Sequence, residues 1–226
     1  MRRMRGDAAT RSSTHRPQAL LLDIGGVLLV SSHERMVDLD APADFTEVRG
    51  LLGPRPDPAW DDVLTGRGRE RAYWAARAAE YGALRGGTGT VPELMAVLYP
   101  DDEPFRPEVI ALMDDAHRAG LTVAALTNDL AAFHGDADIT RHPVLGRFDV
   151  IVDGSVTGVL KPDPRAYAHA LEVLDAPPEA VVFLDDLPGN CAGARAAGIV
   201  TVEVDLRDPS AAVARARDLL ALRAVA

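Results

Sequence analysis

The stretch Ala19-Leu20-Leu21-Leu22-Asp23-Ile24-Gly25-Gly26-Val27-Leu28-Leu29 decides the fold class of this chain. An apolar run of strand length ends on one carboxylate, and two glycines turn the chain before a second apolar run. A short apolar run bounded by turn residues is typical of a buried strand in a parallel sheet. Ligands of open α/β sheets bind outside the carboxyl ends of the strands, so Asp23 is a candidate functional residue. Considered alone, Asp23 could equally brace the turn or cap a helix.

The second half of the chain alternates apolar strands with amphipathic helices. Strands are expected at 121–126, 148–152, 181–184 and 199–204, and helices at 106–119, 164–174, 189–197 and 209–222. This alternation predicts an α/β fold in which a doubly wound parallel sheet forms a Rossmann-like core.

The sequence between these two parts has a different pattern of apolar residues. Residues 31–106 lack strand-like runs and show helical patterns at 44–52, 69–84 and 91–98. We therefore expect a helical insertion at 31–106 in a core domain formed by 18–30 and 107–226. Residues 1–17 are rich in arginine without an apolar period, and we expect them to be a disordered tail.

Composition excludes several classes of protein. Cys191 is the only cysteine of the 226 residues, so neither an intrachain disulfide nor a multi-cysteine metal site can form. The formal net charge of −10 argues against a nucleic-acid partner. No apolar run is long enough to span a bilayer and no signal-peptide pattern follows the basic start, so we expect no membrane partner and a cytoplasmic location. The oligomeric state stays open between a monomer and a homodimer.

Polar residues follow three of the expected strands. Asp23 follows the first, Thr127 and Asn128 the second, and Asp185-Asp186 a third. Lys161, the only lysine against 23 arginines, precedes an expected helix. Parallel strands would bring these groups to one edge of the sheet.

This set of residue types suits phosphoryl transfer. Clustered carboxylates that stay ionised need a cation, and oxygen ligands select Mg²⁺. A metal and Lys161 would offset the repulsion between an anionic nucleophile and a phosphate, and would stabilise the charge that is transferred. A carboxylate can itself be the nucleophile and pass through an aspartyl-phosphate.

The motifs resemble those of the haloacid dehalogenase (HAD) superfamily, in order and in spacing. The resemblance rests on Asp23-Ile24-Gly25-Gly26-Val27, Leu126-Thr127-Asn128, Gly158-Val159-Leu160-Lys161-Pro162-Asp163-Pro164 and Phe183-Leu184-Asp185-Asp186. The helical insertion resembles the small cap of the subfamily I enzymes, so 31–106 is expected to be a helical cap domain.

The resemblance implies a Mg²⁺-dependent phosphatase that acts on a small phosphorylated metabolite, of sugar-phosphate type, through an aspartyl-phosphate. Asp23 would be the nucleophile. The implied metal ligands are Asp23, the backbone carbonyl of Gly25, Asp186, and Asp185 directly or through water. The implied groups around the phosphate are Thr127, Asn128, Gly26 and Lys161, while Asn190 would orient the acidic loop.

The sequence departs from the family pattern at Gly25. The usual phosphatase motif is Asp-x-Asp, whose second aspartate protonates the leaving group, and losing such a group typically costs about 10²- to 10⁴-fold in rate. Asp129, His33, Glu34 or water could take over that role, and the sequence does not choose among them.

Two other functions remain open. A dehalogenase would not need the proton donor, because halide leaves unprotonated, but that activity normally has an aromatic residue where Gly25 stands. A catalytically silent HAD domain that binds a ligand is the third possibility, and substrate identity is not encoded in any motif.

Overall fold

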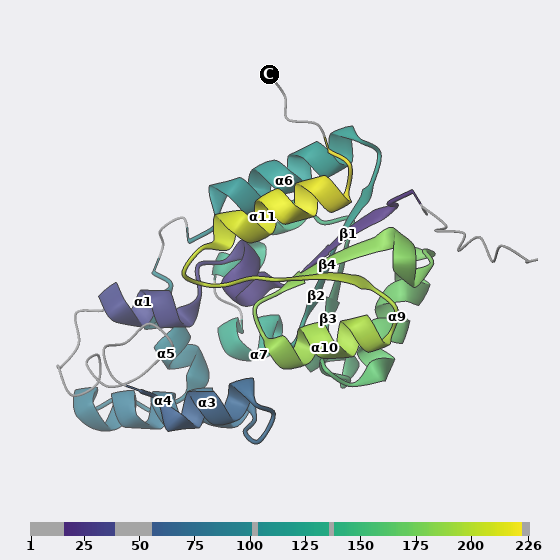
Figure 1. Ribbon diagram of the computed structural model, residues 1–226. Helices are drawn as coiled ribbons and strands as arrows, with labels where there is room; N and C mark the ends of the chain where they lie inside the picture. Colours follow the sequence, from purple (N-terminus) through teal and green to yellow (C-terminus); the bar gives the residue numbers. More distant parts are fainter. Residues whose placement is uncertain (1–15, 39–55, 101–103, 136–137, 223–226) are drawn as a thin grey trace, which may run out of the picture.

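The computed structural model describes residues 16–38, 56–100, 104–135 and 138–222 (Figure 1). Five strands form one sheet in the order β3-β2-β1-β4-β5, and every neighbouring pair is parallel. The strands are β1 (Ala19–Leu22), β2 (Thr122–Thr127), β3 (Val150–Asp153), β4 (Val181–Asp185) and β5 (Val200–Glu203). The predicted parallel α/β sheet is confirmed, with strand bounds shifted by one or two residues.

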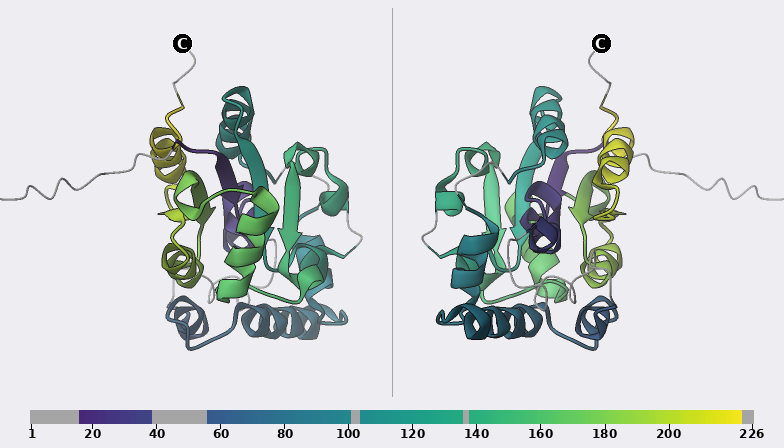
Figure 2. Two further views of the ribbon diagram at one scale, coloured as in Figure 1. Left: turned by 90° about the vertical axis from the view of Figure 1, so that its right-hand side faces the viewer. Right: turned by 90° about the vertical axis from the view of Figure 1, so that its left-hand side faces the viewer.

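Helices cover both faces of the sheet, and side chains that alternate along β1 contact them on opposite faces. Leu20 and Leu22 share one apolar cluster with residues of α6 and α11, whereas Leu21 packs with Tyr167 in a second cluster on the opposite face. Figures 1 and 2 show the resulting three layers. The helices beside the sheet are α6 (Pro107–Arg118), α9 (Pro164–Leu174), α10 (Pro188–Ala196) and α11 (Pro209–Leu219). The sheet is therefore buried on both sides, which explains why its strands are almost wholly apolar.

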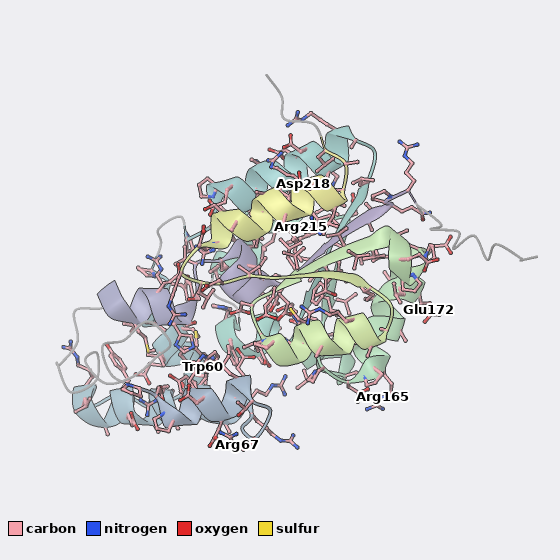
Figure 3. All side chains as sticks on the ribbon, viewed as in Figure 1. Trp60, Arg67, Arg165, Glu172, Arg215 and Asp218 are labelled. Atoms are coloured by element: carbon pink, nitrogen blue, oxygen red, sulfur yellow. The ribbon has the colours of Figure 1, made fainter. Side chains whose placement is uncertain are left out.

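Two of these helices, α9 and α11, begin with a proline preceded by an aspartate. The Asp163 side chain accepts a hydrogen bond from the backbone N–H of Arg165, and Asp208 does the same for Ala211. A cap oxygen of this kind satisfies one of the free N–H groups at a helix start. The exposed charged side chains of these helices, such as Glu172, extend away from the sheet (Figure 3).

The segment between β1 and α6 is helical in its described parts. It holds α1 (Ser32–Asp38), α3 (Pro58–Leu64), α4 (Glu70–Arg85) and α5 (Val91–Leu98). Trp60, Tyr73, Trp74 and Met95 belong to a third apolar cluster that these helices form among themselves. The helices α4 and α5 match the predicted 69–84 and 91–98, but α1 and α3 were not predicted.

Two sequence-based expectations concern residues outside the described ranges. The helix expected at 44–52 lies there, as does almost all of the tail expected at 1–17. None of the described helices combines the length and the apolar character that crossing a membrane requires.

Candidate active site

The register of the sheet brings two of the predicted carboxylates side by side. Leu22 of β1 is paired with Leu184 of β4, so Asp23 and Asp185 both come next, at the same level of neighbouring strands. Asp186 follows directly. One carboxylate oxygen from each of these three aspartates lies within 4.8 Å of the others. The expected acidic cluster therefore forms at the carboxyl edge of the sheet.

Lys161 reaches into this cluster from the loop before α9. Its Nζ atom lies 3.0 Å from Oδ2 of Asp23 and 2.6 Å from Oδ2 of Asp185, and its side chain is buried. Burial alone would lower the pKa of this ammonium, but the carboxylates of Asp185 and Asp23 raise it above its ordinary value. Lys161 is therefore a permanently charged bridge between two strand ends.

Asn128 fixes the backbone of Lys161. Its side-chain oxygen accepts a hydrogen bond from the Lys161 N–H at 2.7 Å, and its Nδ2 donates to the Lys161 carbonyl at 3.1 Å. A second hydrogen on Nδ2 is left for a ligand, because an amide nitrogen donates twice. Asn128 and the buried Thr127 both line the pocket that Asp23 faces. Asn128 thus positions the lysine, a role that was not predicted.

Asp185 lies beneath the pocket and has no exposed surface. Its Oδ1 accepts hydrogen bonds from the backbone N–H of Leu187 at 2.9 Å and from Nδ2 of Asn190 at 3.0 Å. Asn190 thus orients the acidic loop, as expected. Asp23 and Asp186 line the pocket, whereas Asp185 does not. Asp185 is therefore placed to hold Lys161 in position from below.

Negative charge exceeds positive charge in the cluster that Asp23, Asp185, Asp186 and Lys161 form. Burial raises the pKa of Asp23 to about 7, with Lys161 lowering it and Asp185 raising it further. Burial, followed by the charges of Asp185 and Asp23, raises the pKa of Asp186 well above its usual range. These shifts mean that ionising the whole cluster is unfavourable without another cation. Because the available donors are all oxygens, the residues fit a hard divalent cation such as Mg²⁺.

The two glycines after Asp23 have different surroundings. Gly26 has a φ of +73°, and a Cβ atom there would lie 2.4 Å from Oδ2 of Asp186. Only glycine fits this position without displacing the carboxylate. A Cβ atom on Gly25 would meet no heavy atom within 4 Å, and Gly25 also lines the pocket. The chain therefore has open space where a side chain could project toward a ligand.

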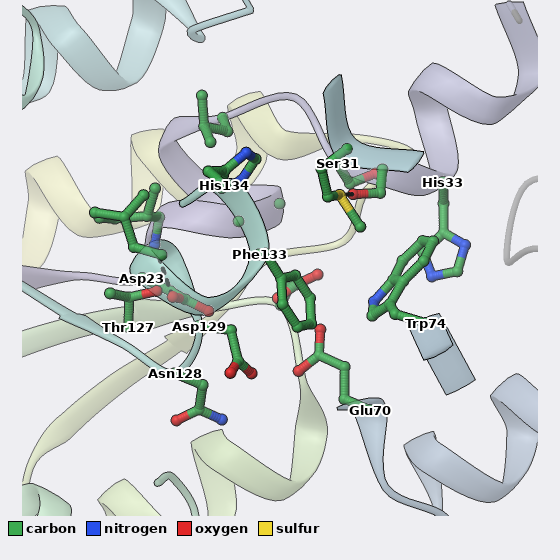
Figure 4. A pocket seen from close by; sticks show the side chains of 18 of the residues that line it. Asp23, Ser31, His33, Glu70, Trp74, Thr127, Asn128, Asp129, Phe133 and His134 are labelled. Atoms are coloured by element: carbon green, nitrogen blue, oxygen red, sulfur yellow. Dashed lines mark hydrogen bonds between the residues drawn. The ribbon is translucent and has the colours of Figure 1, made fainter. Parts of the chain in front are cut away.

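The pocket above the cluster is roofed by the inserted helices (Figure 4). Its base is polar and its walls are largely aromatic. Among the wall residues are Trp60, Trp74, Tyr99, Phe133, His33 and His134. The buried His33 lies against Trp60, with ring centroids 4.1 Å apart, and neither ring nitrogen has a hydrogen-bond partner among the described residues. Burial lowers the pKa of His33 to about 3, so this ring is neutral at physiological pH.

The alternatives to the missing aspartate are mostly engaged elsewhere. Arg71 donates from Nε to Oδ1 of Asp129 at 2.5 Å. Glu34 forms an ion pair with Arg106, which also donates to the carbonyl of Gly26. Each acidic side chain that the sequence suggested thus has a basic partner.

Glu70 was not predicted, yet it lines the same pocket. It opens α4 between Arg69 and Arg71, in a charged stretch that resembles a solvated helix face. No local pattern distinguishes it from an ordinary acidic residue in a first helical turn. Only the placement of α4 over the sheet edge shows that its carboxyl group faces the site.

Comparison with known proteins defines the class of this chain. Residues 17–198 match the sequence model of a family described as haloacid dehalogenase-like hydrolase. The match covers strands β1 to β4, the acidic cluster and the inserted helices. The chain belongs to the haloacid dehalogenase-like hydrolases.

One curated relative resembles this chain over nearly its whole length. The chain is 32% identical over 213 residues to phosphatase MT3486 of Mycobacterium tuberculosis (strain CDC 1551 / Oshkosh). The aligned region covers 92% of this chain and 95% of that protein. Some other curated relatives are much longer: the match to acyl-CoA dehydrogenase family member 10 of Mus musculus covers 44% of this chain but only 9% of that protein.

Two solved structures have a fold similar to that of this chain. A dehalogenase solved with an intermediate complex matches 92% of this chain and 98% of its own, with a TM-score of 0.61 and 18% identity. YfnB of Bacillus subtilis, solved bound to magnesium, covers 84% of this chain and 87% of its own, with a TM-score of 0.61 and 14% identity.

Proposed function

We propose that this hydrolase is a Mg²⁺-dependent phosphatase of a small phosphorylated metabolite, with Asp23 as the nucleophile. The observation that carries the proposal is the contact of 3.0 Å between Lys161 Nζ and Asp23 Oδ2, beside a carboxylate cluster that favours a divalent cation. An ionised carboxylate, a fixed ammonium and oxygen ligands for a metal are what transfer of a dianionic phosphoryl group requires. Likeness to a phosphatase over nearly the whole chain supports the same reaction.

The reaction would begin with attack of an Asp23 carboxylate oxygen on the phosphorus atom. Lys161 offsets the repulsion between the two anions and keeps Asp23 oriented, since the ammonium is itself held by Asp185. Thr127, the free amide hydrogen of Asn128 and the backbone of Gly26 would bind the phosphoryl oxygens. The bond to the leaving oxygen breaks as the aspartyl-phosphate forms, and water then hydrolyses this intermediate.

Mg²⁺ would bind to Asp23, Asp186 and the Gly25 carbonyl, with Asp185 behind them. Its charge would stabilise the negative charge on the transferred group and relieve repulsion within the acidic cluster. The inserted helices would serve as a cap domain that keeps bulk water from the reaction. The pocket combines aromatic walls with polar side chains, which suits a small polar leaving group, and a sugar is the class that we propose.

Hydrolysis of p-nitrophenyl phosphate with and without Mg²⁺ tests the proposal. Asp23→Asn should abolish turnover, since an amide cannot act as the nucleophile, and EDTA should do the same for the wild type. Asp114→Asn is the matched control, because Asp114 pairs with Arg147 at the surface and lies outside the pocket. Full activity of Asp23→Asn would contradict the mechanism.

A substrate panel separates this function from its alternatives. Sugar phosphates, nucleotides, phosphorylated small acids and 2-haloacids would each be supplied, and inorganic phosphate and halide would be measured. Metal-dependent phosphate release, greatest for a sugar phosphate, is the expected result. Metal-independent halide release would instead identify a dehalogenase, and no turnover of any compound would identify a silent domain.

A further inference from the structure

Glu70 presents a carboxyl group to the active-site pocket from the start of α4. Figure 4 shows its side chain extending toward the space between Asp129 and Phe133. Among the described residues, no hydrogen bond or ion pair engages its carboxyl oxygens. A carboxyl group that lines a site and has no structural partner is available to a ligand.

The other candidate proton donors around the pocket are less suitable. Asp129 is held by Arg71 and Glu34 by Arg106, so both carboxyl groups already have a basic partner. Burial raises the pKa of Asp129, but the hydrogen bond and the charge of Arg71 act against this increase. His33 is neutral, since its pKa is about 3, and it can donate only as an imidazole. Glu70 is the remaining acidic side chain of the pocket that belongs neither to the acidic cluster nor to an ion pair, within the described residues.

The charges that surround Glu70 favour its protonated form. Burial, followed by the carboxylates of Asp23 and Asp129, raises the pKa of Glu70 to about 8, and Lys161 opposes this only in part. The arginine next in sequence, Arg71, is directed to Asp129 instead. An acid that keeps its proton near neutral pH is suited to protonating a leaving group.

The turn after Asp23 offers no proton donor of its own. Gly25 has no side chain, and no heavy atom lies within 4 Å of the position that a Cβ atom would occupy. A phosphoryl group held between Asp23 and Thr127 would direct its leaving oxygen into this pocket, toward the inserted helices. The acid must therefore come from the helices or from water.

We propose that Glu70 is the general acid and base of the reaction, which deepens the phosphatase function proposed above and rests on it. As Asp23 bonds to phosphorus and the leaving P–O bond breaks, Glu70 gives its proton to the departing oxygen, and an alcohol leaves. The Glu70 carboxylate then takes a proton from the water that attacks the aspartyl-phosphate. Phosphate departs, Asp23 regains its carboxylate and Glu70 its proton, so one water is consumed per ester cleaved.

The test compares two leaving groups in the Glu70→Gln variant. p-Nitrophenolate can leave without being protonated, whereas the alkoxide released from an alkyl phosphate needs a proton. The alkyl phosphate for this test is the one in the panel that the wild type hydrolyses fastest. The variant should lose about 10²- to 10⁴-fold in turnover of the alkyl ester. With p-nitrophenyl phosphate in a stopped-flow experiment, it should release one p-nitrophenolate per enzyme at near the wild-type rate and then slow, because the base for the second step is missing.

Two controls separate this role from a structural one. Glu108→Gln removes a half-buried first-turn glutamate of α6, outside the pocket, and should behave as the wild type in both assays. Adding Gly25→Asp to Glu70→Gln should restore turnover of the alkyl ester, since the open space at Gly25 can hold a new carboxyl group. Recovery by this second change shows that the single variant is folded.

Other outcomes overturn the proposal in distinguishable ways. Near-wild-type turnover of both esters by Glu70→Gln would assign the proton to water. A matching loss of Mg²⁺ affinity in a calorimetric titration would make Glu70 a metal ligand instead. If Asp23→Asn keeps full activity, or if the wild type hydrolyses no phosphate ester, the phosphatase function fails and this proposal with it.

Discussion

Oδ2 of Asp185 lies 2.6 Å from Nζ of Lys161, and both side chains are buried. The same ammonium lies 3.0 Å from Asp23, so one buried cation joins two strand ends and the loop before α9. A buried ion pair is costly to create and more costly to break, since removing one partner leaves an unpaired charge. Asp185 is therefore both a structural anchor and the support that directs Lys161 toward Asp23, the nucleophile that we propose.

Replacing the lysine tests both roles of this pair. Lys161→Met should abolish phosphatase activity and lower the free energy of unfolding by about 3–5 kcal/mol, the range for breaking a buried pair. Urea unfolding at neutral pH measures the second effect. Adding Asp185→Asn to Lys161→Met should recover part of the lost stability but none of the activity. Equal stability of wild type and Lys161→Met would show that the pair does not hold the strand ends together.

The two glycines should respond differently to the same substitution. Gly26→Ala should lower both stability and activity, because its φ is +73° and the new Cβ would lie 2.4 Å from Asp186 Oδ2. Gly25→Ala should fold as stably as the wild type, since its Cβ meets open space. Melting temperatures and turnover of p-nitrophenyl phosphate check both variants. A larger loss of stability in Gly25→Ala than in Gly26→Ala would contradict the described turn.

Divalent cations should stabilise the protein through Asp186. Since a bound ligand stabilises the folded state by mass action, the melting temperature should rise with MgCl₂ but not with NaCl at equal ionic strength. The raised pKa of Asp186 means that its charge destabilises the metal-free fold above its unfolded pKa of 3.8. Asp186→Asn should therefore raise the melting temperature without metal and remove the response to Mg²⁺. An unchanged response would exclude Asp186 as a ligand.

The edge of the sheet could be predicted because each of its groups follows a recognisable strand. Asp23 and Asp185 end apolar runs, and parallel pairing then places them side by side whatever the details of the loops. Lys161 was recognisable as a lone lysine in a chain of arginines, within a motif of known order. Apolar strand runs and topology were enough for the two aspartates, whereas Lys161 was found from its motif.

The roof of the pocket could not be predicted in the same way. Glu70 and His33 lie on helices whose inward faces depend on how α1 and α4 pack over the sheet edge, and their local sequences carry no such information. His33 in particular lies between charged and polar residues, yet it is buried against Trp60. Tertiary packing, and not helical periodicity, decides which polar side chains of these helices face the ligand.

The burial of His33 should make stability depend on pH. In the folded protein the pKa of His33 is about 3, because the ring is buried beside Trp60 and Trp74 and only Asp57 favours its charged form. In the unfolded chain its pKa is about 6.5. Between these values the unfolded chain binds a proton that the folded protein does not, so stability from this group is intact above pH 6.5 and falls by about 1.4 kcal/mol per unit as pH drops toward 3.

Urea unfolding of His33→Phe between pH 7.5 and 4.5 isolates this contribution. The variant should lose less stability than the wild type as pH falls, with the difference starting near pH 6.5 and growing steadily below it. His169→Asn is the control, because the His169 side chain is exposed on α9 and should leave the slope unchanged. Parallel curves for the wild type and His33→Phe would mean that the ring accepts a proton inside the fold. His33 would then become a candidate proton donor in the pocket, in competition with Glu70.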